Sequence, residues 1–168
     1  EAIEELKDNG YDLFTAMGTF DGHSRKAEDC LYLRSFFIDL DVGVDKHPDK
    51  DTALAELQRL LDETGLPEPV VTDSGGGIHA YWLFDRDIPR DEWKPYAEKF
   101  KALCMSHVHI DPAVSADPAR IMRCPNTYNH KLEQKRPTAF LVDEFTVYNW
   151  DEMKEFLGEP VVRKDDVL

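Results

Sequence analysis

The stretch Phe36-Phe37-Ile38-Asp39-Leu40-Asp41 constrains the fold of this chain more than any other. An apolar run that ends in acid, apolar residue, acid is typical of a buried strand with a charged end. Because successive side chains of a strand point to opposite faces, Asp39 and Asp41 share one face and Leu40 turns into the core. Neighbouring carboxylates repel each other, so the pattern favours a divalent cation with oxygen ligands. The alternative is a strand that runs into an acidic turn, since Val42-Gly43-Val44-Asp45 follows.

Length and composition are those of an ordinary globular domain. The chain has 168 residues, of which 42% are hydrophobic and 32% are charged, enough for one domain with a real core. No apolar run approaches the ~20 residues that cross a bilayer, and no leader peptide is visible. We therefore expect a cytoplasmic protein of a bacterial, archaeal or phage-infected cell with no membrane partner. The first residue is Glu1 rather than Met, so we expect a piece of a longer protein.

The net charge of −14, from 34 acidic against 20 basic residues, excludes a broad basic face for nucleic acid. Any site for a polyanion must be local. The three cysteines form no CxxC pair, which argues against a disulfide framework and for a reducing compartment. Cys104, His107 and His109 lie close in sequence, but their spacing matches no common zinc module.

The pattern of apolar residues predicts an α+β, or mixed α/β, domain. We expect helices over 1–10, 51–64, 89–107 and within 145–157, and strands over 11–17, 30–40, 70–72, 78–84, 108–111 and 138–142. Residues 18–29 are expected to be a polar loop, and residues 117–122 a helical turn. The helix over 51–64 is expected to begin at Asp51 as its cap and to end at Gly65. Strands and helices mix without a regular βαβ period.

A glycine turn separates two of the expected strands, at Ser74-Gly75-Gly76-Gly77-Ile78-His79. Three consecutive glycines lose much conformational entropy on folding. Such a run is typical of a place where the backbone must approach a ligand closely. The N–H groups of such a turn can cradle phosphate, and Ser74 and His79 could donate further hydrogen bonds. The alternative is a flexible hairpin with a surface histidine.

Ile110-Asp111 adds a third acid at an expected strand end. With Asp39 and Asp41 it would complete a two-metal site of the kind used in phosphoryl transfer. Asp117 is a rival for this third position. Alone, an acid before Pro112 is most often a turn residue.

The segment from Arg120 to Lys131 is the most basic part of an acidic chain. Arg120 and Arg123 lie three apart, on one face if the segment is helical. Asn129, His130 and Lys131 follow a turn that contains Pro125. Guanidinium and ammonium groups at fixed positions suit a triphosphate. The alternative is a surface loop with salt bridges to the many acids.

The order of these features resembles the archaeo-eukaryotic primase superfamily. The resemblance rests on the hydrophobic-Asp-hydrophobic-Asp strand, then Ser-Gly-rich-His, then hydrophobic-Asp, then Arg-x-Pro-x-x-x-Asn-x-Lys, and it runs from about Tyr11 to Lys131. Ser-Gly-Gly-Gly-Ile-His-Ala-Tyr-Trp and Ala-Arg-Ile-Met-Arg-Cys-Pro-Asn-Thr-Tyr-Asn-His-Lys are similar to signatures of its phage and plasmid primase–polymerases. The resemblance implies a two-lobed core with an RNA-recognition-like half, a mixed sheet flanked by helices, and acids in the cleft between the lobes.

The resemblance also implies roles for individual residues. Asp39, Asp41 and Asp111 would be the catalytic acids that bind two Mg²⁺ or Mn²⁺ ions. The nucleotide-binding set would be Ser74, Gly75, Gly76, Gly77, His79, Arg120, Arg123, Asn129 and Lys131. Replicative primase subunits have arginines in the loop after the serine, where this chain has glycines, and a histidine where Asn129 sits. The contacts to the triphosphate would therefore differ from those in the replicative primase subunits.

We thus expect residues 1–157 to be a catalytic domain, and residues 158–168 to be a tail or a linker to a further C-terminal domain. The implied activity is template-dependent joining of NTP or dNTP on single-stranded DNA, with a helicase domain or partner elsewhere. Two alternatives stay open at this point. One is a metal-dependent nuclease, and the other is a replication-initiator module that binds DNA without turnover.

Overall fold

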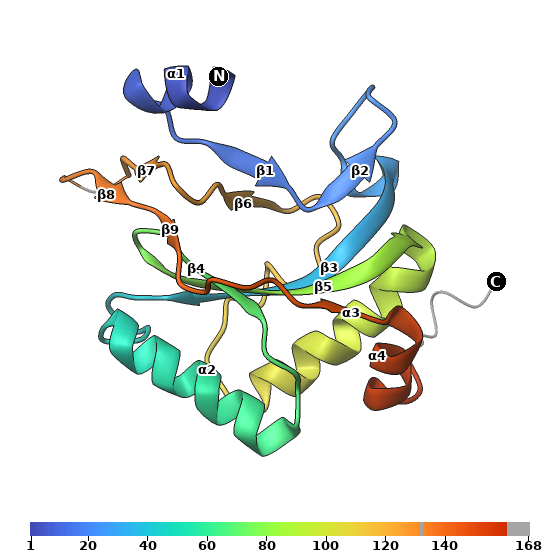
Figure 1. The fold of residues 1–168 in the computed structure, drawn as a ribbon. Coiled ribbons are helices and arrows are strands. Elements are labelled where there is room, and N and C mark those ends of the chain that lie inside the picture. The colour runs from blue at the N-terminus through green and yellow to red at the C-terminus, as the bar shows by residue number, and fades with distance from the viewer. Residues whose placement is uncertain (132, 161–168) are drawn as a thin grey trace.

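The structure is a computed structural model that describes residues 1–131 and 133–160. Within these residues a six-stranded sheet runs through the middle of the molecule (Figure 1). Its strands are β2 (Gly18–Phe20), β3 (Cys30–Asp41), β4 (Val70–Asp73), β5 (Gly77–Pro89), β9 (Ala139–Phe140) and β10 (Val147–Tyr148). The order is β2–β3–β5–β4–β9 with antiparallel neighbours, and β10 lies parallel to β5. The sheet is mixed, as the resemblance implied.

Two long helices, α2 (Lys50–Thr64) and α3 (Arg90–Met105), lie on one side of the sheet (Figure 1). The short helix α4 (Trp150–Leu157) packs beside α3. The α2 helix begins at Asp49, whose carboxylate accepts a hydrogen bond from the Thr52 N–H at 2.7 Å, so the expected cap at Asp51 is wrong. It ends, as expected, at Gly65 in a left-handed conformation.

Aromatic rings fill the space between the sheet and these helices. Phe36 of β3 stacks on Phe100 of α3 at 4.7 Å between ring centroids and meets Phe84 edge-on at 4.9 Å. Trp82 and Trp93 are fully buried in the same cluster. The indole N–H groups of these two tryptophans donate to the backbone oxygens of Pro67 and Ser35, so burial leaves neither unpaired. This core gives β3 and β5 a rigid base.

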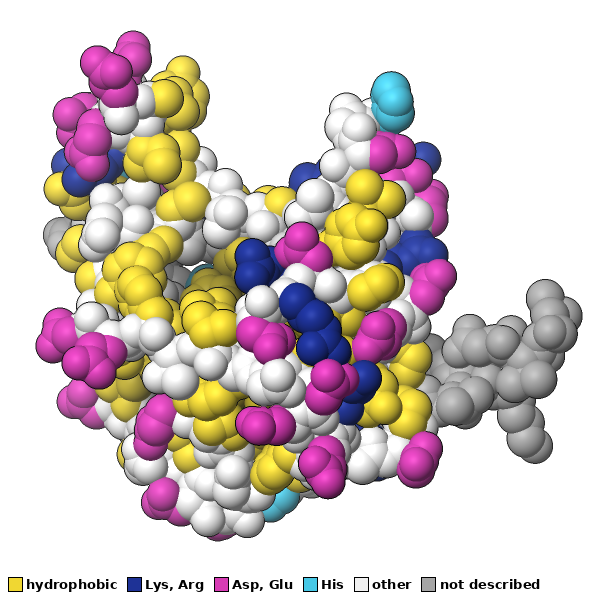
Figure 2. Space-filling model, turned by 45° about the vertical axis from the view of Figure 1, so that its right-hand side comes forward, with side chains coloured by type: hydrophobic (Ala, Val, Ile, Leu, Met, Phe, Trp, Pro, Cys, Tyr) yellow, Lys and Arg dark blue, Asp and Glu magenta, His cyan; other side chains and the backbone are white. Residues whose placement is uncertain are grey.

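A second, thinner layer lies over the opposite face of the sheet. It contains α1 (Ala2–Asp8), the antiparallel pair β1 (Phe14–Ala16) with β6 (Ile121–Arg123), and the pair β7 (Tyr128–Asn129) with β8 (Arg136–Pro137). In Figure 2 the surface is deeply notched between the raised part that carries α1 and the raised part on the other side. The expected two-lobed α+β architecture is confirmed.

Three local expectations are wrong. Residues 117–122 do not form a helical turn, because Ile121–Arg123 pairs as β6 with β1, more than a hundred residues earlier in the chain. Residues 108–111 form no strand and instead cross the end of β3 as a loop. Residues 18–29 are not only loop, since β2 pairs with β3 and Ala27–Asp29 forms a 3₁₀ turn. In the first case a strand distant in the sequence supplies the pairing, and in the third case the next strand along the chain does. Local propensity alone predicts neither pairing.

No helix in residues 1–131 and 133–160 is long and apolar enough to cross a bilayer. Of the expected tail, residues 158–160 follow α4, and residues 161–168 lie outside the described residues.

We predict that Gly77→Ala lowers the free energy of unfolding by about 1–3 kcal/mol. A Cβ atom at Gly77 would lie 2.5 Å from the Leu40 backbone oxygen and 3.0 Å from the Asp41 Cα, so β3 and β5 would have to move apart. Gly76→Ala is the matched control, because its Cβ would meet nothing closer than the Asn129 Nδ2 at 3.7 Å. Urea unfolding followed by circular dichroism measures the free energy of unfolding of both variants. Equal stability of the two variants would contradict this packing.

Candidate active site

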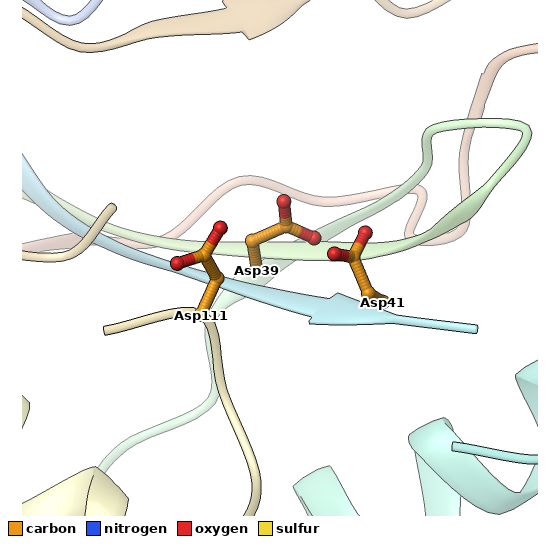
Figure 3. A group of neighbouring side chains, drawn as sticks. All are labelled: Asp39, Asp41 and Asp111. Atoms are coloured by element: carbon orange, nitrogen blue, oxygen red, sulfur yellow. The ribbon is translucent and has the colours of Figure 1, made fainter. Parts of the chain in front are cut away.

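Three carboxylates meet on the face of the sheet that looks away from α2 and α3 (Figure 3). Asp39 and Asp41 lie at the end of β3, one residue apart in the alternation that the sequence predicted. Asp111 comes from the loop after α3, and its backbone N–H donates to the Asp39 backbone oxygen at 3.1 Å. One oxygen from each of the three side chains lies within 4.8 Å of the others. The structure therefore brings together the three acids that the sequence analysis singled out.

The electrostatics of this triad are unfavourable without a cation. Burial, and then the charges of Asp41 and Asp111, raise the pKa of Asp39 to about 7. The Oδ1 atom of Asp39 is buried and has no hydrogen-bond partner. Converging carboxylate oxygens are the ligands that Mg²⁺ and Mn²⁺ prefer. The donor set thus fits the divalent cations that the resemblance implied.

His79 stands directly across from Asp39 in the β3–β5 register. Its Nε2 lies 3.6 Å from the Asp39 Oδ1, too far for a hydrogen bond. Burial lowers the pKa of His79 to about 4, so the imidazole is neutral near pH 7. The Tyr81 hydroxyl lies 3.2 Å from the Nδ1 of His79. When that hydroxyl donates to Nδ1, the hydrogen of the ring is on Nε2, which faces the acids.

The glycine turn is rigid rather than flexible. The Ser74 N–H donates to the Gly77 oxygen at 3.0 Å, and the Gly75 N–H donates to the Asp73 carboxylate at 2.7 Å. Gly75 has φ of +83°, and a Cβ there would lie 2.7 Å from the Asn129 Cβ. The turn is therefore pressed against Asn129 and has no room for a side chain at Gly75.

Asn129 joins this turn to the basic segment. Its Nδ2 donates to the Ser74 oxygen at 3.0 Å, and its Oδ1 accepts from the Lys131 N–H at 3.0 Å. The amide is buried and both of its ends bond to backbone. The side chain thus fixes Lys131 relative to the glycine turn, and its role in nucleotide binding stays a prediction.

The two arginines of the basic segment lie near the cleft as part of a strand region, not on a helix face. Arg123 ends β6, where its guanidinium pairs with Asp12 at 2.6 Å and lies over the Phe14 ring at 4.7 Å. Arg120 precedes β6, and its Nε is buried without a hydrogen-bond partner. A buried donor without a partner lowers the stability of the folded state unless a ligand supplies an acceptor.

These groups line one cleft of about 400 Å³, within the size range of ligand sites. Its lining residues include the three acids, Ser74, Gly76, His79, Arg120, Arg123, Asn129 and Lys131. Gly75 and Gly77 belong to the same turn but do not line the cleft. Asp117 does not line it either, because its carboxylate accepts from the Ala119 N–H in a turn. The geometry thus favours Asp111 over Asp117 as the third acid.

Sequence reasoning missed four residues that shape this cleft, namely Asp12, Phe14, Lys46 and Tyr81. Asp12 and Phe14 act through Arg123, which lies in a distant segment, so no local pattern marks them. Tyr81 was recognisable only as a residue two positions after His79 in a strand, hence on the same face. Lys46 had a weaker signal, a cation five residues after Asp41.

We predict that Asp39→Asn stabilises the protein in the absence of divalent cations, increasingly as the pH rises. The folded-state pKa of Asp39 is raised above its usual value of 3.8 to about 7, so the folded state binds this proton more tightly than the unfolded state does. The stability that this proton contributes is present below about pH 4 and is lost as the pH rises through 7.

At pH 8 with EDTA the gain of the variant should be on the order of 2–4 kcal/mol. Chemical unfolding at pH 5, 6, 7 and 8 measures it, with Asp62→Asn on the exposed side of α2 as the control. A difference between Asp39→Asn and wild type that does not change with pH would contradict the prediction.

Comparison with known proteins agrees with this architecture. No family model matches the chain. A replication protein of Clostridium perfringens is 28% identical over 171 residues, a match that covers 95% of this chain and 40% of the relative. The chain therefore spans well under half the length of that relative. Among solved structures, the AEP domain of the cyanophage S-2L primase–polymerase matches with a TM-score of 0.70 and 19% identity, over 94% of this chain and 76% of that one. The chain thus has the archaeo-eukaryotic primase fold that its motif order predicted.

Proposed function

We propose that this chain is the catalytic domain of a DNA primase–polymerase. It would join nucleotides from NTP or dNTP to a growing strand on a single-stranded DNA template, with release of pyrophosphate. One observation carries the proposal: a triad of carboxylates, a neutral histidine and a basic segment line a single cleft. The fold and the replication protein among the relatives support a role in replication.

Asp39, Asp41 and Asp111 are the residues that would hold two Mg²⁺ or Mn²⁺ ions. When bound, such ions neutralise charge on the attacking 3′-hydroxyl and on the departing pyrophosphate. The triad supplies the matching negative charge from a rigid base, because Asp39 and Asp41 extend from a strand buried on its other face. Asp111 is fixed to that strand by its own backbone N–H.

The other groups that line the cleft are suited to a triphosphate. When the Tyr81 hydroxyl donates to its Nδ1, the neutral His79 carries its hydrogen on Nε2 and can donate it to a phosphate oxygen. Ser74 and the glycine turn place backbone groups beside it. Arg120 brings a buried donor that lacks a partner, and Lys131 brings an ammonium group.

The guanidinium of Arg123 is constrained by two partners. Asp12 and the Phe14 ring fix its guanidinium, and Arg123 lines the cleft. Because Asp12 already offsets part of the positive charge, Arg123 would orient a phosphate by its fixed geometry more than by its net charge.

The net charge of −14 gives the domain little general attraction for DNA. We therefore propose that template binding by this domain alone is weak and salt-sensitive. A further domain or a helicase partner would supply the rest. Tight, salt-insensitive DNA binding by this chain alone would contradict that part of the proposal.

The activity test uses single-stranded template, with and without a primer, labelled NTP or dNTP and Mn²⁺. We expect extended products from the wild type and a loss of at least 10²-fold in Asp39→Ala/Asp41→Ala, since charge-stabilising groups of this kind contribute several kcal/mol each in the transition state. Asp117→Ala is the matched acid control, because its carboxylate lies in a turn outside the cleft. Products made equally well by the double variant would overturn the polymerase proposal.

His79→Ala and Lys131→Ala separate a polymerase from a nuclease. A nuclease could use the same carboxylates but would need no triphosphate-binding groups. We expect both variants to raise the KM for nucleotides in the polymerase assay. Degradation of the labelled template that depends on the triad and is indifferent to His79 and Lys131 would favour the nuclease. Template binding with neither products nor degradation would favour a non-catalytic initiator module.

A further inference from the structure

Lys46 lies beside the three acids and lines the same cleft, although no motif includes it. Its ammonium nitrogen is 2.5 Å from the Oδ2 of Asp41. The pKa of Lys46 is raised, first by its hydrogen bond to Asp41 and also by the charges of Asp39 and Asp111. Lys46 and two or more of the acids line both the main cleft and a smaller hollow next to it. The ammonium group therefore neutralises part of the charge of the triad.

The backbone of Lys46 is anchored close to the acids. Residues 42–47 fold back on themselves, with the His47 N–H donating to the Asp41 oxygen at 3.1 Å and the Gly43 N–H donating to the His47 oxygen at 3.0 Å. His47 is buried, and its Nε2 lies 2.8 Å from the His109 oxygen, two residues before Asp111. The loop is thus tied both to the end of β3 and to the segment that carries the third acid.

The side chain of Lys46, in contrast, is free to leave. It is 44% exposed, and four rotatable bonds separate its charge from this anchored backbone. An ammonium group and a divalent cation compete for the Oδ2 atom of Asp41, because each is attracted to the same carboxylate and the two positive charges repel each other.

We propose that Lys46 is a built-in counter-cation, which neutralises Asp41 in the metal-free protein and is displaced from it when a divalent cation binds. This proposal rests on the metal-binding part of the proposed function. It implies that the wild type binds metal more weakly than the triad alone would, because the ion pair must first break. It also implies that the metal-free protein depends on Lys46 for stability, since the acids repel one another.

Lys46→Met tests both consequences, because Met removes the charge and keeps the length of the side chain. We expect Mn²⁺ to bind Lys46→Met roughly fivefold more tightly than wild type, a change typical of the loss of a partly exposed ion pair. We also expect a lower Tm in EDTA and a larger rise in Tm on addition of Mn²⁺. Isothermal titration calorimetry without nucleotide or DNA gives the affinity, and differential scanning calorimetry gives the Tm.

The chain offers two matched controls. Lys50 pairs with Asp73 at 2.8 Å, outside the triad, so Lys50→Met should leave the affinity for Mn²⁺ within twofold of wild type. Lys46→Arg retains the charge and should also stay near wild type. Lys46→Gln, a polar replacement at this exposed position, repeats the test if Lys46→Met is poorly folded.

The outcomes separate this proposal from the proposed function. If wild type binds Mn²⁺ and Lys46→Met binds it equally or more weakly, the counter-cation proposal is wrong and the metal site stands. If wild type binds no Mn²⁺ at millimolar concentration while remaining folded, both proposals are wrong. Tighter binding by Lys46→Met supports the counter-cation whether or not the protein makes DNA.

Discussion

The pairing of β3 with β5 is the interaction on which the rest of the site depends. Its antiparallel register places Asp39 opposite His79 and Asp41 opposite Gly77. A shift of one residue would turn the acids toward the helices and bring Leu40 into the cleft, so the register and the site are specified together. The aromatic core beneath makes such a shift costly, because Phe36 and Trp82, directly paired in this register, are both fully buried against α3 and its neighbours.

The site is built at some cost to the stability of the metal-free protein. Three carboxylates converge beside a buried, neutral histidine, and one carboxylate oxygen has no hydrogen-bond partner. Such concentrations of like charge are typical of sites that bind a cation. The neighbouring cations are not equivalent. Lys46 pairs directly with Asp41 of the triad on a flexible side chain, whereas the guanidinium of Arg123 pairs with Asp12. In our account the first offsets charge before metal binds, and the second orients the substrate.

The sequence predicted correctly those parts of the site that depend on the pattern within a single strand. Alternation alone placed Asp39 and Asp41 on one face, and the order of motifs predicted the fold. It was less successful where two distant segments define the structure. Residues 117–122 are expected to form a helical turn, but pairing with β1 makes Ile121–Arg123 a strand. Asp12 and Phe14 contribute through contacts with Arg123 that no local pattern contains. Tyr81 shares a strand face with His79, which alternation along the strand does indicate. The helix cap at Asp49 instead of Asp51 is an error of two residues, typical of element ends.

Anomalous X-ray scattering from a crystal grown with Mn²⁺ and a non-hydrolysable deoxynucleoside triphosphate would test the central claim most directly. Our account predicts manganese peaks within direct bonding distance of carboxylate oxygens from Asp39, Asp41 and Asp111. It also predicts the triphosphate beside His79 and Lys131, and the Lys46 ammonium no longer bonded to Asp41. Manganese absent from the triad of such a crystal, or a nucleotide bound elsewhere on the molecule, would contradict it.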